Sequence, residues 1–329
     1  MSSRFHHYLV LLLVFFFAAV SPRLSEGAKL YVVYASISGT QAIGWIAKEA
    51  GLFPKHGLDV ELLFTGGGRA ITSLLGGDTP LITVGGPSVI AARLAGSDAI
   101  ITAHVFDTIL YSLMVQPEIR TLADLKGKKV GASRFGSATD FALRYVLKQN
   151  GFDPVKDVVI FQIGGQSETL AALRAGSIYG GVIASPATAE AKRLGMRELI
   201  NMGNLGVEYP HTTIATTERF LRANRETVLR FTRAYVEGAH RFLTDRELSL
   251  KVIGKYTKIQ SRPTLEATYD DYAPYVKKIP SPTAGSIKTV LEQLSVTDPK
   301  ARTTRPQEFI DASIVSELEQ QGFFKQVWR

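Results

Sequence analysis

The stretch "GGGRAITSLLGGDTPLITVGGPSVIAARLAG" (residues 66–96) decides the fold, because it places glycine-rich turns, helix-like apolar spacing and a short apolar run in one unit. A second stretch, residues 164–195, aligns with it at a constant offset that puts Gly66 on Gly165, and Pro87 on Pro186. Chance matching of helix-ending glycines is the alternative. Agreement in proline, glycine and apolar phase favours an internal repeat and therefore two similar lobes.

The same unit recurs from Lys29 onward. Short apolar runs predict strands at 30–35, 58–64, 81–85, 128–132, 158–163 and 181–184, and helices begin near residues 40, 69, 87, 137, 166 and 186. Strands that alternate with helices and are this apolar indicate an α/β fold, with a mostly parallel sheet flanked by helices in each lobe.

The last third of the chain has no repeat partner. "HTTIATTERF" (211–220) predicts a returning strand, and residues 225–243 predict an amphipathic helix with Val228, Phe231 and Tyr235 on one face. We expect a helical C-terminal segment that packs on one lobe or bridges both.

The N-terminus has the features of an export signal. Arg4 precedes an unbroken apolar run from Leu9 to Val20, and small residues follow at Ser25 and Gly27. We interpret residues 1–27 as a cleaved signal peptide; an uncleaved anchor is the alternative, although the run is shorter than the ~20 residues that span a bilayer.

Composition excludes several classes of protein. The chain has 329 residues, 45% of them hydrophobic, which is enough for a sizeable core, and it has no cysteine, so disulfides, thiolate metal sites and a lipid-bearing cysteine are excluded. The formal net charge is +8, yet Lys and Arg form no long runs. Nucleic acid is therefore disfavoured as a partner, and anionic small molecules are favoured.

Catalytic motifs are absent from the sequence. There is no G-x-S-x-G, no H-E-x-x-H, no phosphate-binding loop and no complete G-x-G-x-x-G, so no catalytic residue, cofactor or metal is predicted. His211 follows Pro210 in a possible inter-lobe crossing and could reach a cleft, although a structural role is the simpler interpretation.

Small-residue loops follow each predicted strand, at 35–41, 65–70, 84–88, 133–139, 164–168 and 184–188. In parallel sheets such loops meet at the carboxyl edge, against helix N-termini whose N–H groups can bind a small polar or anionic ligand. Helix capping by each Ser or Thr, and an exposed surface position for Arg69 and Arg134, are the alternatives. The predicted ligand-binding residues are Ser36, Ser38, Gly39, Gly67, Gly86, Pro87, Ser88, Ser133, Gly136, Ser137, Thr139, Gln166, Ser185 and Pro186.

Three segments carry a resemblance to a known family: "AKEAGLFPKHGLDVEL" (47–62), "LADLKGKKVGASRFGSATDFALRYVLKQNGFDP" (122–154) and "SETLAALRAGSIYGGVIASPATAEAKRLG" (167–195). With the export signal, they resemble periplasmic substrate-binding proteins of ABC importers, in the group that binds nitrate, sulfonates, taurine and thiamine precursors. The chain departs from that group in "YGGVIASP", where an aspartate and a tryptophan-glutamate pair are often found, so no ligand specificity is carried over.

The resemblance implies the type II periplasmic binding fold, with two hinge crossings near 106–114 and 205–214. The expected divisions are 1–27 signal peptide, 28–110 first part of lobe I, 111–208 lobe II, and 209–329 the return to lobe I plus C-terminal helices. It also implies a periplasmic monomer that delivers a small organic, anionic solute to an inner-membrane ABC permease. The alternatives are an enzyme on the same fold, such as a pyrimidine synthase or a menaquinone-pathway protein, and a receptor ectodomain.

Overall fold

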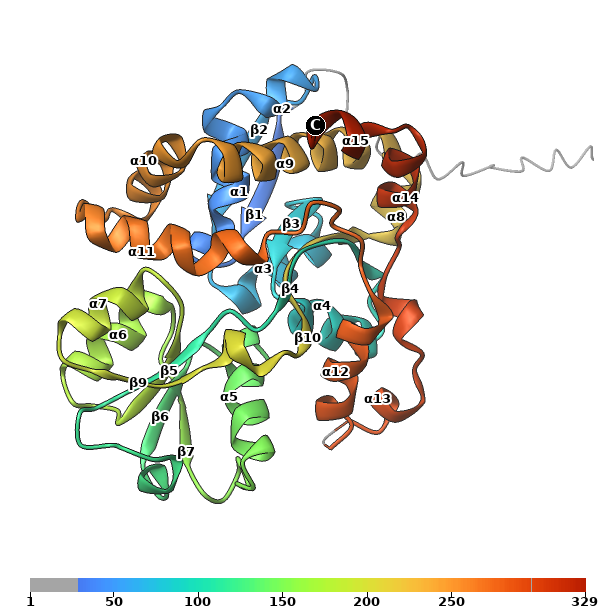
Figure 1. The fold of residues 1–329 in the computed structure, drawn as a ribbon. Coiled ribbons are helices and arrows are strands. Elements are labelled where there is room, and N and C mark those ends of the chain that lie inside the picture. The colour runs from blue at the N-terminus through green and yellow to red at the C-terminus, as the bar shows by residue number, and fades with distance from the viewer. Residues whose placement is uncertain (1–28, 297) are drawn as a thin grey trace, which may run out of the picture.

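The computed structural model describes residues 29–296 and 298–329, so the predicted signal peptide lies outside the described residues. Figure 1 shows two α/β lobes, one above the other, with the C-terminal helices distributed around the upper lobe. None of the helices in the described part of the chain is both long enough and apolar enough to cross a membrane.

Lobe I, the upper lobe in Figure 1, contains a five-stranded sheet with the order β2-β1-β3-β10-β4. Its strands are β1 (Leu30–Tyr34), β2 (Val60–Phe64), β3 (Leu81–Val84), β4 (Ala99–Thr108) and β10 (Glu208–Thr217). β1 pairs in parallel with β2 and β3, whereas β10 runs antiparallel to β3 and β4. Val32 and Val33 of β1 point into different apolar clusters, which is why this strand is apolar at consecutive positions.

Lobe II contains the second five-stranded sheet, with the order β7-β6-β8-β5-β9. Its strands are β5 (Ser112–Val115), β6 (Lys129–Ala132), β7 (Val159–Gln162), β8 (Gly180–Ile183) and β9 (Arg197–Asn201). β6 pairs in parallel with β7 and β8, and β5 is antiparallel to β8 and β9. The predicted sheets are thus confirmed with one refinement, since in each sheet the strand that follows a crossing runs against the others.

The six predicted strands are present, and the returning strand is β10. The sequence analysis missed β4, β5 and β9, because two of them flank the first crossing and have no glycine or proline at their boundaries to mark them as separate elements. The chain leaves lobe I after Thr108 and returns at Glu208, which pairs with Thr108; the pairing of β10 with β4 then resumes at Thr212. The proposed domain limits stay predictions.

Helices cover both faces of each sheet. Those that follow strands in the repeated units are α1 (Ala42–Glu49), α2 (Leu52–Lys55), α3 (Gly67–Gly76), α4 (Gly86–Leu94), α5 (Ala138–Gln149), α6 (Gln166–Arg174) and α7 (Ala187–Arg193). Figure 1 shows α5 on one face of the lobe II sheet and α6 and α7 on the other. Short 3-10 helices are η1 (Gly39–Gln41), η2 (Leu122–Leu125), η3 (Met202–Leu205), η4 (Ala273–Tyr275) and η5 (Pro306–Phe309).

The C-terminal helices bridge both lobes, which is one of the two arrangements expected. They are α8 (Glu218–Ala223), α9 (Arg225–Thr244), α10 (Arg246–Thr257), α11 (Arg262–Tyr272), α12 (Ala284–Leu294), α13 (Lys300–Thr303), α14 (Ser313–Gln320) and α15 (Phe323–Val327). α9 packs on α1 and α2, where the rings of Phe53 and Phe231 stack 5.3 Å apart. α11 reaches α7, and α12 reaches α5, so lobe II is contacted at two places.

One apolar cluster continues from lobe I into lobe II. It joins Val84 and Val89 of lobe I to Ala138 and Phe141 of α5, and Tyr209 stacks on Phe141 with ring centroids 4.9 Å apart. Burial of this kind contributes roughly 25 cal/mol for each Å² of apolar surface removed from water. The cluster therefore positions the two lobes relative to each other.

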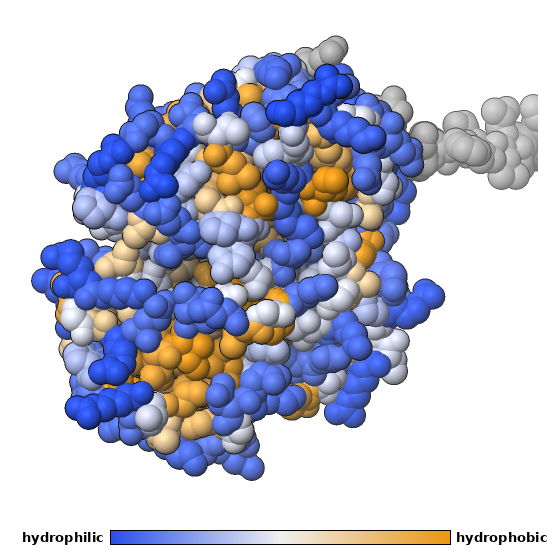
Figure 2. Space-filling view, in the orientation of Figure 1, coloured by the Kyte–Doolittle hydropathy of each residue, from blue (hydrophilic) through white to orange (hydrophobic). Residues whose placement is uncertain are grey.

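The outer surface is mostly hydrophilic. Figure 2 shows apolar residues gathered on lobe II, over β5 and its neighbours, with hydrophilic residues around them. Leu199 and Ile200 of the edge strand β9 are half-buried.

Candidate functional site

A cavity of about 600 Å³ lies between the lobes. Its walls come from the loops after β1, β2 and β3 in lobe I, the loops after β6 and β7 in lobe II, and both crossings. The carboxyl ends of parallel strands thus meet at one cleft, where helix N-termini also converge. A cavity of this size suits a small organic molecule.

Six predicted residues line this cavity: Ser36, Ser88, Ser133, Ser137, Thr139 and Gln166. Seven others do not line it: Ser38, Gly39, Gly86, Pro87, Gly136, Ser185 and Pro186. The surroundings of Gly67 lie outside what the structure describes. Contact of any of these residues with a ligand stays a prediction.

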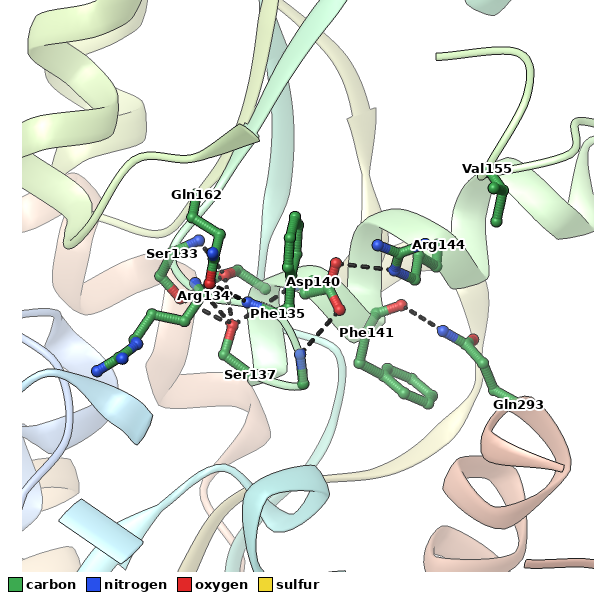
Figure 3. A network of polar contacts seen from close by, with 12 residues as sticks. Ser133, Arg134, Phe135, Ser137, Asp140, Phe141, Arg144, Val155, Gln162 and Gln293 are labelled. Atoms are coloured by element: carbon green, nitrogen blue, oxygen red, sulfur yellow. Dashed lines mark hydrogen bonds and ion pairs between the residues drawn. The ribbon is translucent and has the colours of Figure 1, made fainter. Parts of the chain in front are cut away.

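Hydroxyl groups form a cluster at the start of α5. Ser133 Oγ lies 2.8 Å from Ser137 Oγ and 2.7 Å from Thr139 Oγ1, and the Ser133 N–H donates to Thr139 Oγ1 at 2.9 Å (Figure 3). Ser137 also caps α5, since its hydroxyl accepts from the Asp140 N–H. Capping and lining the cavity are therefore combined in one residue, whereas the sequence analysis set them as alternatives.

Three of the residues that do not line the cavity have other contacts in the structure. Ser38 is buried, and its Oγ lies 2.9 Å from Ser36 Oγ and 2.7 Å from Thr40 Oγ1. Gly86 packs against Pro210, so closely that a Cβ would lie 2.4 Å from the proline Cγ. The Gly136 N–H donates to Asp140 Oδ2 at the exposed end of α5.

The loop at 184–187 does not line the cavity and instead contacts lobe I. The Gly39 N–H and the Tyr272 hydroxyl each donate to the Ser185 carbonyl at 3.0 Å, and the Ser185 hydroxyl donates to the Asp271 carboxylate. We call residues 184–187 the seam loop and their repeat counterparts, residues 85–88, the cavity loop. Polar groups of the seam loop that the sequence assigned to a ligand are bonded to lobe I.

Two glutamines present hydrogen-bond donors at the cavity. Gln162 Oε1 accepts the Phe135 N–H at 2.9 Å, and Gln166 Oε1 accepts the Ala184 N–H at 2.8 Å. A backbone N–H can only be donated to the amide oxygen, so these bonds orient both side chains and leave both NH₂ groups to donate elsewhere.

His211 is a third such donor. The Leu110 N–H donates to His211 Nδ1 at 3.1 Å, and burial lowers the pKa of His211 to about 3. The imidazole is therefore neutral at physiological pH, with its proton on Nε2. The ring of Tyr111, whose pKa is raised by burial, lies 4.5 Å from the ring of His211.

Charged side chains at the cavity are predominantly basic. Arg69 and Arg134 line it and are exposed, as is Glu168. The Glu168 carboxylate turns back toward Gly165 at the start of its own helix, where the positive end of the helix dipole complements it.

Sequence reasoning missed several lining residues. Phe64 and Gln162 are the last residues of β2 and β7, so their position at a strand end was a usable signal. Tyr111 lies in a crossing, where nothing in the sequence distinguishes a lining residue. Phe64, Tyr111 and Ile163 add apolar surface beside the donors, which suits an organic ligand.

In the described residues, no hydroxyl that lines the cavity is hydrogen-bonded to a histidine or a carboxylate, as an activated nucleophile would be. Within residues 29–296 and 298–329, no group of three or more His, Asp or Glu residues could hold a metal ion.

Solved structures share this fold, and two of the three described here are binding proteins by name. A protein of Bordetella bronchiseptica RB50 matches with a TM-score of 0.80 at 19% identity, covering 90% of this chain and 98% of that one. The alkanesulfonate-binding protein SsuA of Xanthomonas axonopodis pv. citri, bound to MOPS, matches with 0.72 at 20% identity over 88% and 99% of the chains. The periplasmic nitrate-binding protein NrtA of Synechocystis PCC 6803 matches with 0.70 at 14% identity over 89% and 88%. The fold is therefore that of the periplasmic binding proteins.

Two sequence comparisons agree with the fold. YtlA of Bacillus subtilis (strain 168), whose name describes it provisionally as a binding protein, is 26% identical over 196 residues, which span 58% of this chain and 59% of that protein. The profile of the family described as "NMT1/THI5 like" matches residues 40–247, more than half of the chain. The protein thus belongs to the NMT1/THI5-like family.

Proposed function

We propose that this protein is the extracytoplasmic solute-binding component of an ABC import system, and that it binds a small organic anion between its lobes. The observation that carries the proposal is the array of donors at the cavity. The amide groups of Gln162 and Gln166 and the Nε2–H of His211 are oriented as donors by bonds to backbone N–H groups, and Arg69 and Arg134 add positive charge. Such an array suits a ligand rich in acceptor oxygens.

The remaining parts of the proposal follow from the family and the sequence. Export through residues 1–27, action as a monomer and delivery to a membrane permease are what binding proteins with this fold would require. An enzymatic role on the same fold is less favoured, because none of the described hydroxyls at the cavity is paired with a base.

A panel of sulfonates, carboxylates, nitrate, pyrimidines and aromatic acids tests the proposal through thermal stabilisation of the purified protein. A ligand present at a hundred times its Kd adds about 2.7 kcal/mol to the free energy of unfolding. We expect organic anions to raise Tm and to be recovered chemically unchanged. Recovery of a converted product would support the enzyme, and stabilisation by neutral compounds alone would contradict an anionic ligand.

A single substitution links the response to the donor array. Gln166→Glu keeps an oxygen for the Ala184 N–H but replaces the donating NH₂ group with a negative oxygen, so it should abolish stabilisation by anions. Gln326→Glu, at an exposed position of α15, makes the same change in net charge and should leave the response intact.

A further inference from the structure

The two basic residues at the cavity come from opposite lobes. Arg69 lies in the first turn of α3 in lobe I, and Arg134 lies in the loop between β6 and α5 in lobe II. In the structure the two lobes are in contact, so both side chains border the same cavity.

Arg134 reaches across to lobe I. A Cβ placed on Gly68 would lie 3.4 Å from Arg134 Cδ, 3.5 Å from Nε and 3.7 Å from Cζ, and Gly68 is the residue next to Arg69. Figure 3 shows the Arg134 side chain extending away from the hydroxyl cluster of its own lobe. The Arg134 side chain therefore lies at van der Waals distance from the first turn of α3.

Neither guanidinium has a partner among the described residues. Within residues 29–296 and 298–329, the side chains of Arg69 and Arg134 form no ion pair and no hydrogen bond, whereas Arg144, also in lobe II, donates to Asp140 at 2.8 Å. Glu168, the acidic residue at the cavity, is turned toward its own helix N-terminus. Two like charges that approach when the lobes meet repel each other unless an anion lies between them.

We propose that Arg69 and Arg134 form a clamp that holds an oxyanion of the ligand, such as a carboxylate or sulfonate, between the lobes. A planar guanidinium can bind two oxygens of one anionic group, so two of them suit a group with two or more oxygens. In this arrangement the ligand's negative charge removes the repulsion and favours the closed state. The inference rests on the proposed function, because it identifies which chemical group of the solute is bound and which residues bind it.

The distance between the lobes tests the clamp directly. The chain has no cysteine, so spin labels on K156C of lobe II and R222C of lobe I would be the sole labels; these side chains are 82% and 71% exposed. We expect millimolar methanesulfonate to shorten the distance measured by pulsed electron resonance. Dimethyl sulfone, which has a similar shape but no charge, should leave it unchanged. Equal responses to both compounds, or none to either, would overturn the clamp.

Variants separate the clamp from a general loss of binding. Arg69→Gln and Arg134→Gln should each weaken the response to methanesulfonate at least tenfold, and Arg144→Gln should not. Arg134→Glu should shorten the distance without any anion, because the new carboxylate would pair with Arg69 across the cleft. An unchanged or longer distance in Arg134→Glu would overturn the proposal even if Arg134→Gln failed to fold.

Failure of the clamp and failure of the proposed function give different results. If the solute panel stabilises the protein and the Arg69 and Arg134 variants bind as tightly as the wild type, the clamp is wrong and the binding function stands. If methanesulfonate closes the wild type through the two arginines but every solute that stabilises the protein is recovered as a converted product, the clamp stands and the proposed binding function is wrong.

Discussion

The cavity loop and the seam loop occupy repeat-related positions, after β3 and β8. The cavity loop contributes to the cavity lining, whereas the seam loop is hydrogen-bonded to the other lobe. The cavity loop has Gly85 and Gly86, where the seam loop has Ala184 and Ser185. In lobe I the glycines allow close packing on Ala138 and Pro210, which leaves Ser88 at the cavity. In lobe II Ser185 is bonded to lobe I through its carbonyl and its hydroxyl. An internal repeat therefore supplies the same backbone twice, and side chains at a few positions decide which copy faces the ligand.

The largest effect is expected from making the cavity loop resemble the seam loop. Gly86→Ser would place a Cβ 2.4 Å from Pro210 Cγ and 3.0 Å from the Pro210 carbonyl oxygen, and backbone at that distance must shift. We expect a loss of about 3 kcal/mol in the free energy of unfolding, measured by denaturant titration. The reciprocal change, Ser185→Gly, should cost less because it removes hydrogen bonds without creating a clash. Equal costs would show that packing at Gly86 is not what distinguishes the loops.

The second prediction concerns how the free energy of unfolding depends on pH through His211, which lines the cavity. Burial lowers the pKa of His211 to about 3, so the folded protein leaves this imidazole neutral at pH 5, while the unfolded chain, with a pKa near 6.5, takes up a proton. Stability is therefore complete above pH 6.5 and falls as the pH decreases toward 3. The expected loss from His211 is about 2 kcal/mol between pH 6.5 and 5.

His104 provides the comparison for that measurement. It is also buried, away from the cavity, with a pKa lowered to about 3, and its Nδ1 lies 3.3 Å from Ser286 Oγ. His211→Gln should remove about half of the pH dependence that His211 and His104 together give to the free energy of unfolding. A slope that is unchanged in His211→Gln would mean that this imidazole is protonated in the folded state.

A third prediction addresses the seam. Tyr272→Phe removes one of two donors to the Ser185 carbonyl, so we expect a loss of about 1 kcal/mol in stability and a longer distance between labels on the two lobes. Tyr256→Phe is the matched control, because the hydroxyl of Tyr256 bonds to Glu49 within lobe I. If both variants leave the interlobe distance unaltered, the hydrogen bonds of the seam loop do not hold the two lobes together.

The sequence could predict the fold because periodicity and the repeat are local signals. Buried strands such as β3 and β8 read as apolar runs next to glycine or proline, and each helix start lay within a few residues of its prediction. β4 and β9 were missed because pairing partners far along the chain, not local residues, define them.

The site could be predicted only in part, for the same reason. Residues in the loops that follow strands, such as Ser36 and Ser137, line the cavity, and loop position follows from the strand pattern. The role of Ser185 depends on Tyr272, which lies in the C-terminal helices and has no repeat partner. His211 acts as a donor because the Leu110 N–H holds its other nitrogen, and no local pattern carries that contact.

The smallest effect on stability, and the most direct test of the comparison, is expected at Ser88 and its repeat counterpart Ala187. Ser88 lines the cavity, and within residues 29–296 and 298–329 its hydroxyl makes no hydrogen bond to the protein. Ser88→Ala should change the unfolding free energy by less than about 0.5 kcal/mol but weaken binding of the best anion of the panel about fivefold, as the loss of one hydrogen bond would. Ala187→Ser adds the same hydroxyl to the seam loop and should leave the affinity, measured by calorimetry, unchanged. If Ala187→Ser instead weakened binding and Ser88→Ala did not, the ligand would contact the seam loop, and the assignment of the two repeat-related loops would have to be exchanged.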